Sequence, residues 1–195
     1  NSLALEREKI FHRIIVPREA FEELNETYSV GEKVRDVGPI VRRSELGDAE
    51  KNFLRTALAE RFRRPFTSLV VTMLGGGVAA DRSAQTVALA ASLSRRTNVL
   101  HLVVVWPTAT IDTGLFGWPN THIVRTHHAS ALVVAADLYV SAAGYNSFHE
   151  AIYNRIPTIF IPQMAVYMDD QHARATAAFE RGLAVLVEPH EIMSL

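Results

Sequence analysis

Short runs of β-branched and other apolar residues recur along the chain, and stretches of helix-forming residues separate them. The apolar runs predict strands at residues 68–74, 99–105, 122–124, 138–141, 158–161 and 184–187. The stretches between them predict helices at residues 81–95, 127–136, 147–153 and 170–181. Gly182 follows the last of these helices, at the position where a residue in the left-handed conformation commonly ends a helix.

Strands that alternate with helices predict a parallel sheet covered by helices on both faces. The predicted strands are apolar at successive positions rather than at every second one, as burial on both faces requires. We therefore expect an α/β fold with a doubly wound, Rossmann-like parallel sheet of about six strands.

The N-terminal part of the chain has a weaker pattern. A strand is predicted at residues 14–16 and a helix at 18–24, and the polar segment 25–36 separates them from an apolar strand at 37–41 and a helix at 48–63. Because the first strand and helix are too short to bury a core, we expect residues 1–36 to be a remnant of another domain with a linker. Residues 37–195 are then one domain.

Composition and charge narrow the class of partner. The 195 residues are 48% hydrophobic, which suffices for a globular core, and the formal net charge is −1. Since acidic and basic residues are interspersed, we expect no binding to nucleic acid or to an anionic membrane surface. No apolar run approaches the roughly 20 residues of a transmembrane helix. A small molecule or another protein is the expected partner.

The absence of cysteine excludes disulfides and thiolate metal sites and is typical of a reducing compartment, so a cytoplasmic location is expected. The eight histidines form no HExxH motif and no close set with carboxylates, and we expect no metal site. His127 and His128 are interpreted as surface residues, and Trp106 and Trp118 as packing and loop anchors.

Ligands of open parallel sheets bind beyond the carboxyl ends of the strands, and three loops there have unusual sequences. The first contains Gly75, Gly76 and Gly77, whose backbone amides a phosphate can approach closely, although a flexible turn explains the triplet equally well. It is neither a GxGxxG motif nor a P-loop, and no acidic residue ends the second strand, which disfavours a dehydrogenase.

The second loop, residues 142–150, opens a helix directly after a strand, so its amides and the helix dipole favour an anion. Ser147 and Glu150 have the spacing of a capping box, which is the alternative interpretation of this pair. The third loop ends in Asp-Asp-Gln at residues 169–171. Acids there commonly stabilise the helix dipole, but a carboxylate beside an amide also suits sugar hydroxyls.

The order and spacing of these residues resemble the donor-site motif of GT-B glycosyltransferases, in the MurG-type and UDP-glycosyltransferase groups. The matching residues are Gly144-Tyr145-Asn146-Ser147-Phe148-His149-Glu150, Ile156-Pro157, Ile161-Pro162 and Asp170-Gln171. Residues 37–41 are similar to the strand that enters the C-terminal domain of that family, and residues 14–24 resemble the end of its N-terminal domain. The resemblance implies a C-terminal donor-binding domain whose last helices are truncated at residue 195.

The resemblance also implies the ligand, a nucleoside-diphosphate sugar that is commonly UDP-linked, with no metal and no cofactor. Asn146 and Ser147 would hold the diphosphate, Glu150 the ribose hydroxyls, and Asp170 with Gln171 the sugar. The residues that it places in the donor site are Gly75, Gly76, Gly77, Arg125, Thr126, Gly144, Tyr145, Asn146, Ser147, Glu150, Asp170 and Gln171.

The sequence departs from the family pattern in three places. Ala142 stands where many relatives have His or Arg, the stretch after Arg125 lacks an aromatic residue that often lies near the base, and residues 108–120 show no clear helix. We expect no catalytic residue in this chain, because the family's general base and acceptor pocket usually lie in the N-terminal domain. That domain would belong to the same protein or to a partner subunit.

The predicted function is thus the donor-binding half of a hexosyltransferase-type glycosyltransferase, inactive as an isolated fragment. Two alternatives stay open: a nucleotide-sugar 2-epimerase, and a non-catalytic donor-binding subunit of a split glycosyltransferase.

Overall fold

The computed structural model describes residues 10–25, 32–43, 46–75, 83–163 and 170–192. Contacts divide the chain into two compact units, Asn1–Val41 and Arg42–Leu195, and each is considered by itself. The sequence-based boundary, between residues 36 and 37, lies close to this division. That residues 1–36 belong to another domain stays a prediction.

The first unit contains a pair of parallel strands, β1 (Ile14–Pro17) and β2 (Val34–Val37), in which Ile14 pairs with Val34. Between them, η1 (Glu22–Leu24) is a short 3-10 helix in place of the longer helix predicted at 18–24. The strand predicted at 37–41 is wrong, because β2 ends where that strand was expected to begin. Pro39 has no N–H group and cannot donate a hydrogen bond to a neighbouring strand. The more polar residues 34–37 form a strand instead, because they pair with β1.

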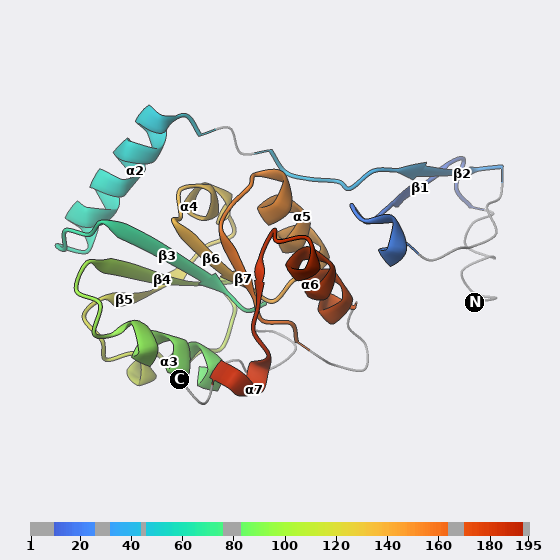
Figure 1. The fold of residues 1–195 in the computed structure, drawn as a ribbon. Coiled ribbons are helices and arrows are strands. Elements are labelled where there is room, and N and C mark those ends of the chain that lie inside the picture. The colour runs from blue at the N-terminus through green and yellow to red at the C-terminus, as the bar shows by residue number, and fades with distance from the viewer. Residues whose placement is uncertain (1–9, 26–31, 44–45, 76–82, 164–169, 193–195) are drawn as a thin grey trace. The chain divides into compact units, whose positions relative to one another are not determined.

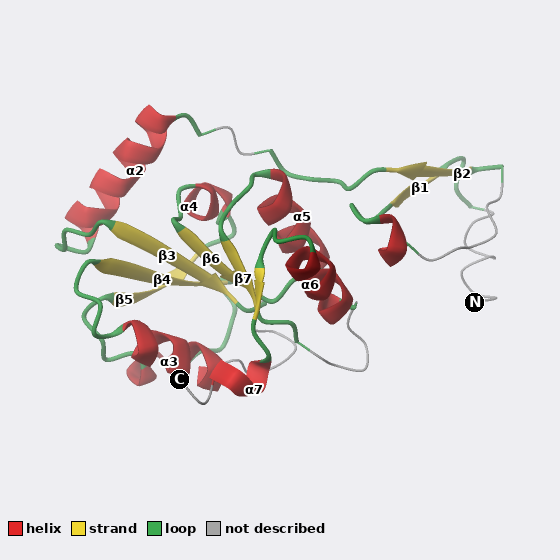
Figure 2. Cartoon of the chain, in the orientation of Figure 1, coloured by secondary structure: helices red, strands yellow, loops and turns green. Residues whose placement is uncertain are grey.

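The second unit alternates strands with helices, as the hydrophobic pattern predicts (Figure 2). Its elements in chain order are α2 (Asp48–Arg61), β3 (Ser68–Met73), α3 (Ser83–Leu93), β4 (Val99–Val105), η2 (Thr113–Leu115), β5 (Thr121–Arg125), α4 (Ser130–Val134), β6 (Leu138–Ser141), α5 (Tyr145–Tyr153), β7 (Thr158–Phe160), α6 (Gln171–Glu180), β8 (Val185–Leu186) and α7 (Pro189–Ile192).

The strands of this unit form one six-stranded parallel sheet in the order β5-β4-β3-β6-β7-β8. The chain proceeds from β3 outward to β5 and then returns to the other side of β3, so the strand order reverses between β3 and β6. Figure 1 shows α3 and α7 along one side of the sheet and α4, α5 and α6 along the other. The predicted doubly wound, Rossmann-like fold is confirmed.

The centre of the sheet is buried on both faces, which explains its continuous apolar sequence. Consecutive residues of β3 and β4, such as Leu69, Val70 and Val71, have almost no exposed surface. On the side of α3 and α7, a core cluster joins strands and helices; its buried members are Val70, Leu74, Leu89, Val99, Val140, Ile161 and Ile192.

Two helix ends show how local chemistry sets the boundaries. Gly182 has φ +66°, and the amides of Gly182 and Leu183 donate to Phe179 and Ala178, which is the expected left-handed termination of α6. α4 is shorter than the helix predicted at 127–136, since the Thr126 hydroxyl accepts the His128 amide and forms a turn there.

Candidate functional site

The carboxyl ends of three neighbouring strands are aligned at the point where the strand order reverses. Ser141, the last residue of β6, pairs with Met73 of β3 and with Phe160 of β7. The loops that follow these strands therefore leave the sheet side by side, as ligand-binding loops of doubly wound sheets do. They are the three loops that the sequence singles out.

The loop after β3 contains Gly75, which has φ +106°. An added Cβ at Gly75 would meet no atom within 4 Å, so the backbone conformation rather than lack of space requires glycine. Gly76 and Gly77 lie outside the described residues, and their contact with a phosphate stays a prediction.

The loop after β6 turns sharply into α5. Ala143 is fully buried and has φ +62°, a conformation that costs a residue other than glycine about 1–2 kcal/mol. Gly144 is the N-cap, so α5 begins at Tyr145, two residues earlier than predicted. Such strain is typical of turns that the surrounding structure holds in place, often at functional sites.

The capping-box interpretation of Ser147 and Glu150 is wrong. Gly144 caps α5 and contributes no side-chain hydrogen bond, which places Ser147 inside the first turn instead of at its start. The amides of Asn146 and Ser147 thus lie in the turn whose N–H groups have no acceptor within the helix. This leaves the helix N-terminus suited to an anion.

The polar side chains of this turn differ in exposure. Asn146 is exposed, and Ser147 and Glu150 are half-buried. Burial raises the pKa of the Glu150 carboxyl, and the nearby Arg42 guanidinium opposes this by lowering the pKa. Within the described residues the Glu150 carboxylate makes no hydrogen bond, so its oxygens can accept hydrogen bonds from the hydroxyl groups of a ligand.

A polar cluster that the sequence did not predict lies beneath this turn. Burial raises the pKa of the Tyr139 phenol, the hydroxyls of Ser141 and Ser147 lower the pKa, and the Glu150 carboxylate raises it. The Ser141 Oγ is itself buried, and Tyr139 is a polar side chain that it approaches. The available signal was the placement of Tyr and Ser at alternate positions of the otherwise apolar strand β6.

The start of α6 contains the predicted sugar-binding pair. Asp170 is the N-cap, and its Oδ1 accepts the Ala173 amide at 2.9 Å, so this acid has a capping role at the start of α6. Gln171 is buried, and its Oε1 accepts the amide of Gln163 at 3.0 Å. Gln171 thereby connects the loop after β7 to α6, and its Nε2 lies beside Gly144. Asp169 lies outside the described residues.

Arg125 and Thr126 lie at the end of β5, separated from β6 by β4 and β3, or about 14 Å at typical strand spacing. The Arg125 guanidinium donates to the carbonyl oxygens of Ala109 at 2.6 Å and Pro107 at 3.4 Å, which secures the connection after β4. Trp106, half-exposed at the end of β4, contacts His127 edge-to-face. An aromatic surface therefore exists near the predicted base position.

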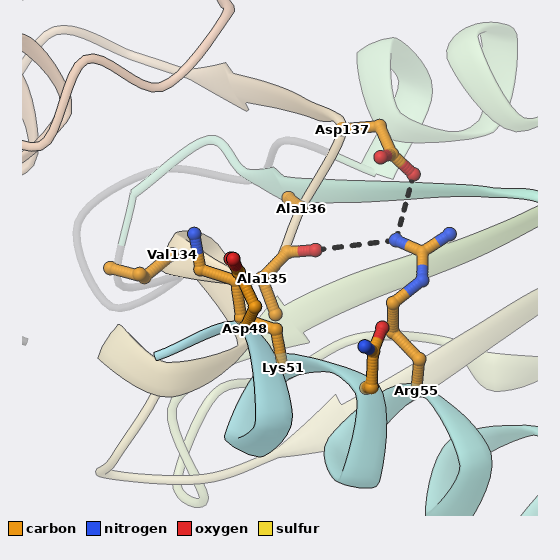
Figure 3. A pocket seen from close by; sticks show the side chains of 8 residues that line it. Asp48, Lys51, Arg55, Val134, Ala135, Ala136 and Asp137 are labelled. Atoms are coloured by element: carbon orange, nitrogen blue, oxygen red, sulfur yellow. Dashed lines mark hydrogen bonds and ion pairs between the residues drawn. The ribbon is translucent and has the colours of Figure 1, made fainter. Parts of the chain in front are cut away.

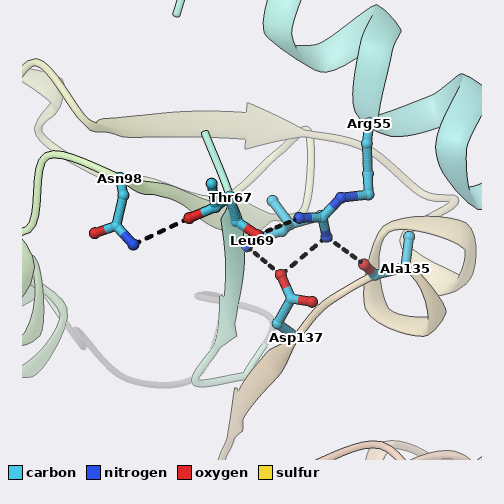
Figure 4. Close-up of polar contacts among 6 residues, drawn as sticks. All are labelled: Arg55, Thr67, Leu69, Asn98, Ala135 and Asp137. Atoms are coloured by element: carbon cyan, nitrogen blue, oxygen red, sulfur yellow. Dashed lines mark hydrogen bonds and ion pairs between the residues drawn. The ribbon is translucent and has the colours of Figure 1, made fainter. Parts of the chain in front are cut away.

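A polar pocket of about 480 Å³ lies near the amino ends of the strands, away from the carboxyl ends that carry the three loops (Figure 3). Figure 4 shows Arg55 of α2 between the chain segments that precede β3 and β6. Its guanidinium donates to Asp137 Oδ2 at 2.9 Å and to the carbonyl oxygen of Thr67 at 2.7 Å, and the Leu69 amide donates to the same carboxylate. Because these contacts join the amino ends of β3 and β6, the pocket is separate from the three loops. The residues that line the pocket are Asp48, Lys51, Asn52, Arg55, Val134, Ala135, Ala136 and Asp137.

The described residues contain no group of three or more His, Asp or Glu side chains placed to hold a metal ion. Among the helices described, none is both long and apolar enough to cross a membrane.

Residues 70–194 match the model of the glycosyltransferase family 28 C-terminal domain, which is well over half of the chain. The chain belongs to this family. The match runs from β3 through α7 and so includes all three loops. Among curated proteins, none matches the sequence significantly.

Solved glycosyltransferases share the fold of this family 28 domain. The glycotransferase of kitacinnamycin superposes with a TM-score of 0.56 at 17% identity, over 84% of this chain and 40% of that protein. The calicheamicin glycosyltransferase CalG4 gives 0.57 at 16%, over 84% and 36%. Os79 from O. sativa, in complex with UDP, gives 0.54 at 21%, over 69% and 32%.

The chain therefore spans at most 40% of the length of these three proteins. At such low identities the structural likeness establishes the fold, and the family match establishes the domain type. The identification from sequence as a C-terminal donor-binding domain of a GT-B glycosyltransferase is confirmed.

Proposed function

We propose that this domain binds the diphosphate of a nucleoside-diphosphate sugar at the N-terminus of α5 and supplies the donor to a glycosyl-transfer reaction. The observation that carries the proposal is the start of α5 at Tyr145, directly after the Gly144 N-cap and at the reversal of strand order. An anion at that point accepts hydrogen bonds from first-turn amides and is stabilised by the helix dipole.

Each side chain of the loops has a role that follows from its position. Asn146 and Ser147 donate hydrogen bonds to phosphate oxygens. Glu150 accepts hydrogen bonds from the two ribose hydroxyls, because an ionised carboxylate has acceptors and no donor. Asp170 and Gln171 lie at the start of α6 and orient the sugar, with Gln171 Nε2 beside Gly144. UDP is the first nucleotide to test, since Os79 and TcCGT1 were each solved in complex with UDP.

The leaving diphosphate accumulates negative charge as the glycosidic bond to it breaks. Amides and a helix dipole fixed in advance stabilise that charge without reorganisation, and they replace a divalent cation in this role. We place the general base and the acceptor pocket in an N-terminal domain, so the present chain binds donor and does not turn over alone.

Replacement of Glu150 by Gln tests the ribose assignment. Glu150 does not belong to a capping box, so the variant removes a carboxylate acceptor and leaves the helix start unchanged. Because a hydrogen bond to a charged group is lost, we expect Glu150→Gln to bind UDP about tenfold more weakly than wild type. Isothermal titration calorimetry measures this affinity. The affinity for 2′,3′-dideoxy-UDP is expected to be the same in wild type and Glu150→Gln.

The matched control is Glu180→Gln, which changes an exposed carboxylate at the end of α6. It is expected to bind UDP as wild type does. If Glu150→Gln binds UDP with wild-type affinity, the ribose assignment is rejected; if wild type itself does not bind UDP or another nucleoside diphosphate, the proposed function is rejected.

A further inference from the structure

Arg174 is a buried cation next to the proposed diphosphate site. It lies on α6 with only 6% of its surface exposed, which is rare for arginine because a buried charge requires compensating contacts. Gln171 and Arg174 are three residues apart and thus share one face of α6. Gln171 lies beside Gly144, so this face is turned toward the start of α5.

Arg174 contacts the residues on either side of the Gly144 N-cap. Its Nη1 lies 3.4 Å from the carbonyl oxygen of Ala143, and its Cζ lies 5.4 Å from the centre of the Tyr145 ring. The contact with Ala143 is a long hydrogen bond and the contact with Tyr145 is a cation–π interaction. Arg174 thus contacts the strained residue of the turn and the first residue of α5.

These two contacts constrain the direction of the first amides of α5. Ala143 has φ +62°, and a residue in this conformation reverts to a more favourable one unless its peptide groups are held. The turn itself, residues 142–150, contains no Lys or Arg. A guanidinium placed next to it adds positive potential to that of the helix N-terminus, which favours an anion there.

We propose that Arg174 is a positioning residue of the diphosphate site, which holds the turn between β6 and α5 and adds positive charge behind it. This rests on the proposed function. Because Arg174 acts on the turn rather than on the nucleoside, its loss weakens binding of the diphosphate group and leaves binding of the nucleoside unchanged.

The test compares Arg174→Met, Arg174→Lys and the control Arg181→Met in the full chain, with UDP and uridine as probes. Arg181 lies at the end of the same helix and donates to the Ala177 carbonyl at 3.0 Å, so its replacement removes a similar contact away from α5. Calorimetry with UDP and NMR titration with uridine give the two affinities.

Arg174→Met is expected to weaken UDP binding at least tenfold with uridine affinity unchanged, Arg174→Lys to recover part of the loss, and Arg181→Met to behave as wild type. Hydrogen exchange without nucleotide supplies a second measure, because the Phe148 amide, which donates to the Gly144 carbonyl at 2.8 Å, exchanges faster in Arg174→Met when the turn is no longer held. Arg174→Lys keeps the test valid if Arg174→Met does not fold.

Equal losses for UDP and uridine in Arg174→Met, or unchanged exchange of the Phe148 amide, would overturn the proposal and leave Arg174 as a packing residue. Failure of wild type to bind UDP would instead reject the proposed function, and the exchange measurement would still decide whether Arg174 holds the turn.

Discussion

Three buried residues form a hydrogen-bonded chain across the centre of the sheet. His101 of β4 has no exposed surface; its Nε2 lies 2.9 Å from Thr72 Oγ1 in β3, and its Nδ1 lies 3.1 Å from Thr121 Oγ1 in β5. Burial lowers the pKa of His101 from 6.5 to about 4. The imidazole is therefore neutral in the folded protein at neutral pH and binds a proton far more readily in the unfolded chain.

This difference predicts a stability that depends on pH. The folded state loses stability as the pH falls below 6.5, the unfolded pKa, and the loss levels off below the folded pKa of about 4. Between about pH 7.5 and about pH 5, the contribution of His101 to the free energy of unfolding is expected to fall by about 2 kcal/mol. Urea titrations of wild type and His101→Gln at both pH values measure it, and the variant should lack this part of the pH dependence. An equal pH dependence in both proteins would contradict the assignment.

The role of a single residue can be predicted from the sequence where it follows from local spacing, and it cannot where distant contacts determine it. Gly182 was predicted correctly, because a left-handed helix end is a local property of the chain. Ser147 and Glu150 have capping-box spacing, but the left-handed turn at Ala143 starts α5 earlier, and this could not be read from spacing. Arg174 meets Ala143 from 31 residues away, so no short-range pattern indicates the contact.

Among the elements, the sequence predicted all six strands of the second unit, because each contains a short apolar run; the edge strand β8 is the shortest, with two residues, Val185–Leu186. The boundaries of helices were less accurate, since hydrogen bonds of polar side chains end or shift them, as Thr126 does before α4. β2 was misplaced, because its residues form a strand only by pairing with β1.

Helices α2, α5 and α6 end in the same hydrogen-bonded turn with different residues at its left-handed position. α6 has Gly182 there, whereas α2 and α5 have the exposed residues Arg63, with φ 49°, and Arg155, with φ 53°. Arginine is strained in this conformation and glycine is not.

Replacing either arginine with glycine is therefore expected to raise the free energy of unfolding by about 0.5–1 kcal/mol, and Gly182→Ala to lower it by about 1 kcal/mol. Urea denaturation of the three variants against wild type checks both signs. Destabilisation by both arginine replacements would show that their side-chain contacts outweigh the backbone strain.

At the scale of the whole molecule, the fold follows from the alternation of buried strands and helices, and the position of the site follows from the fold. The strand order β5-β4-β3-β6-β7-β8 brings the loops after β3, β6 and β7 together, although residues 75 and 170 are far apart in the sequence. The family 28 match covers this part of the chain.

Binding of a nucleoside diphosphate at the start of α5 can be measured by an NMR titration of the ¹⁵N-labelled chain with UDP. We expect the amide signals of Asn146 and Ser147 to move most, with smaller changes at Gly75 and Gln171. Largest shifts at the pocket between α2 and α4, or no saturable shifts at all, would contradict it.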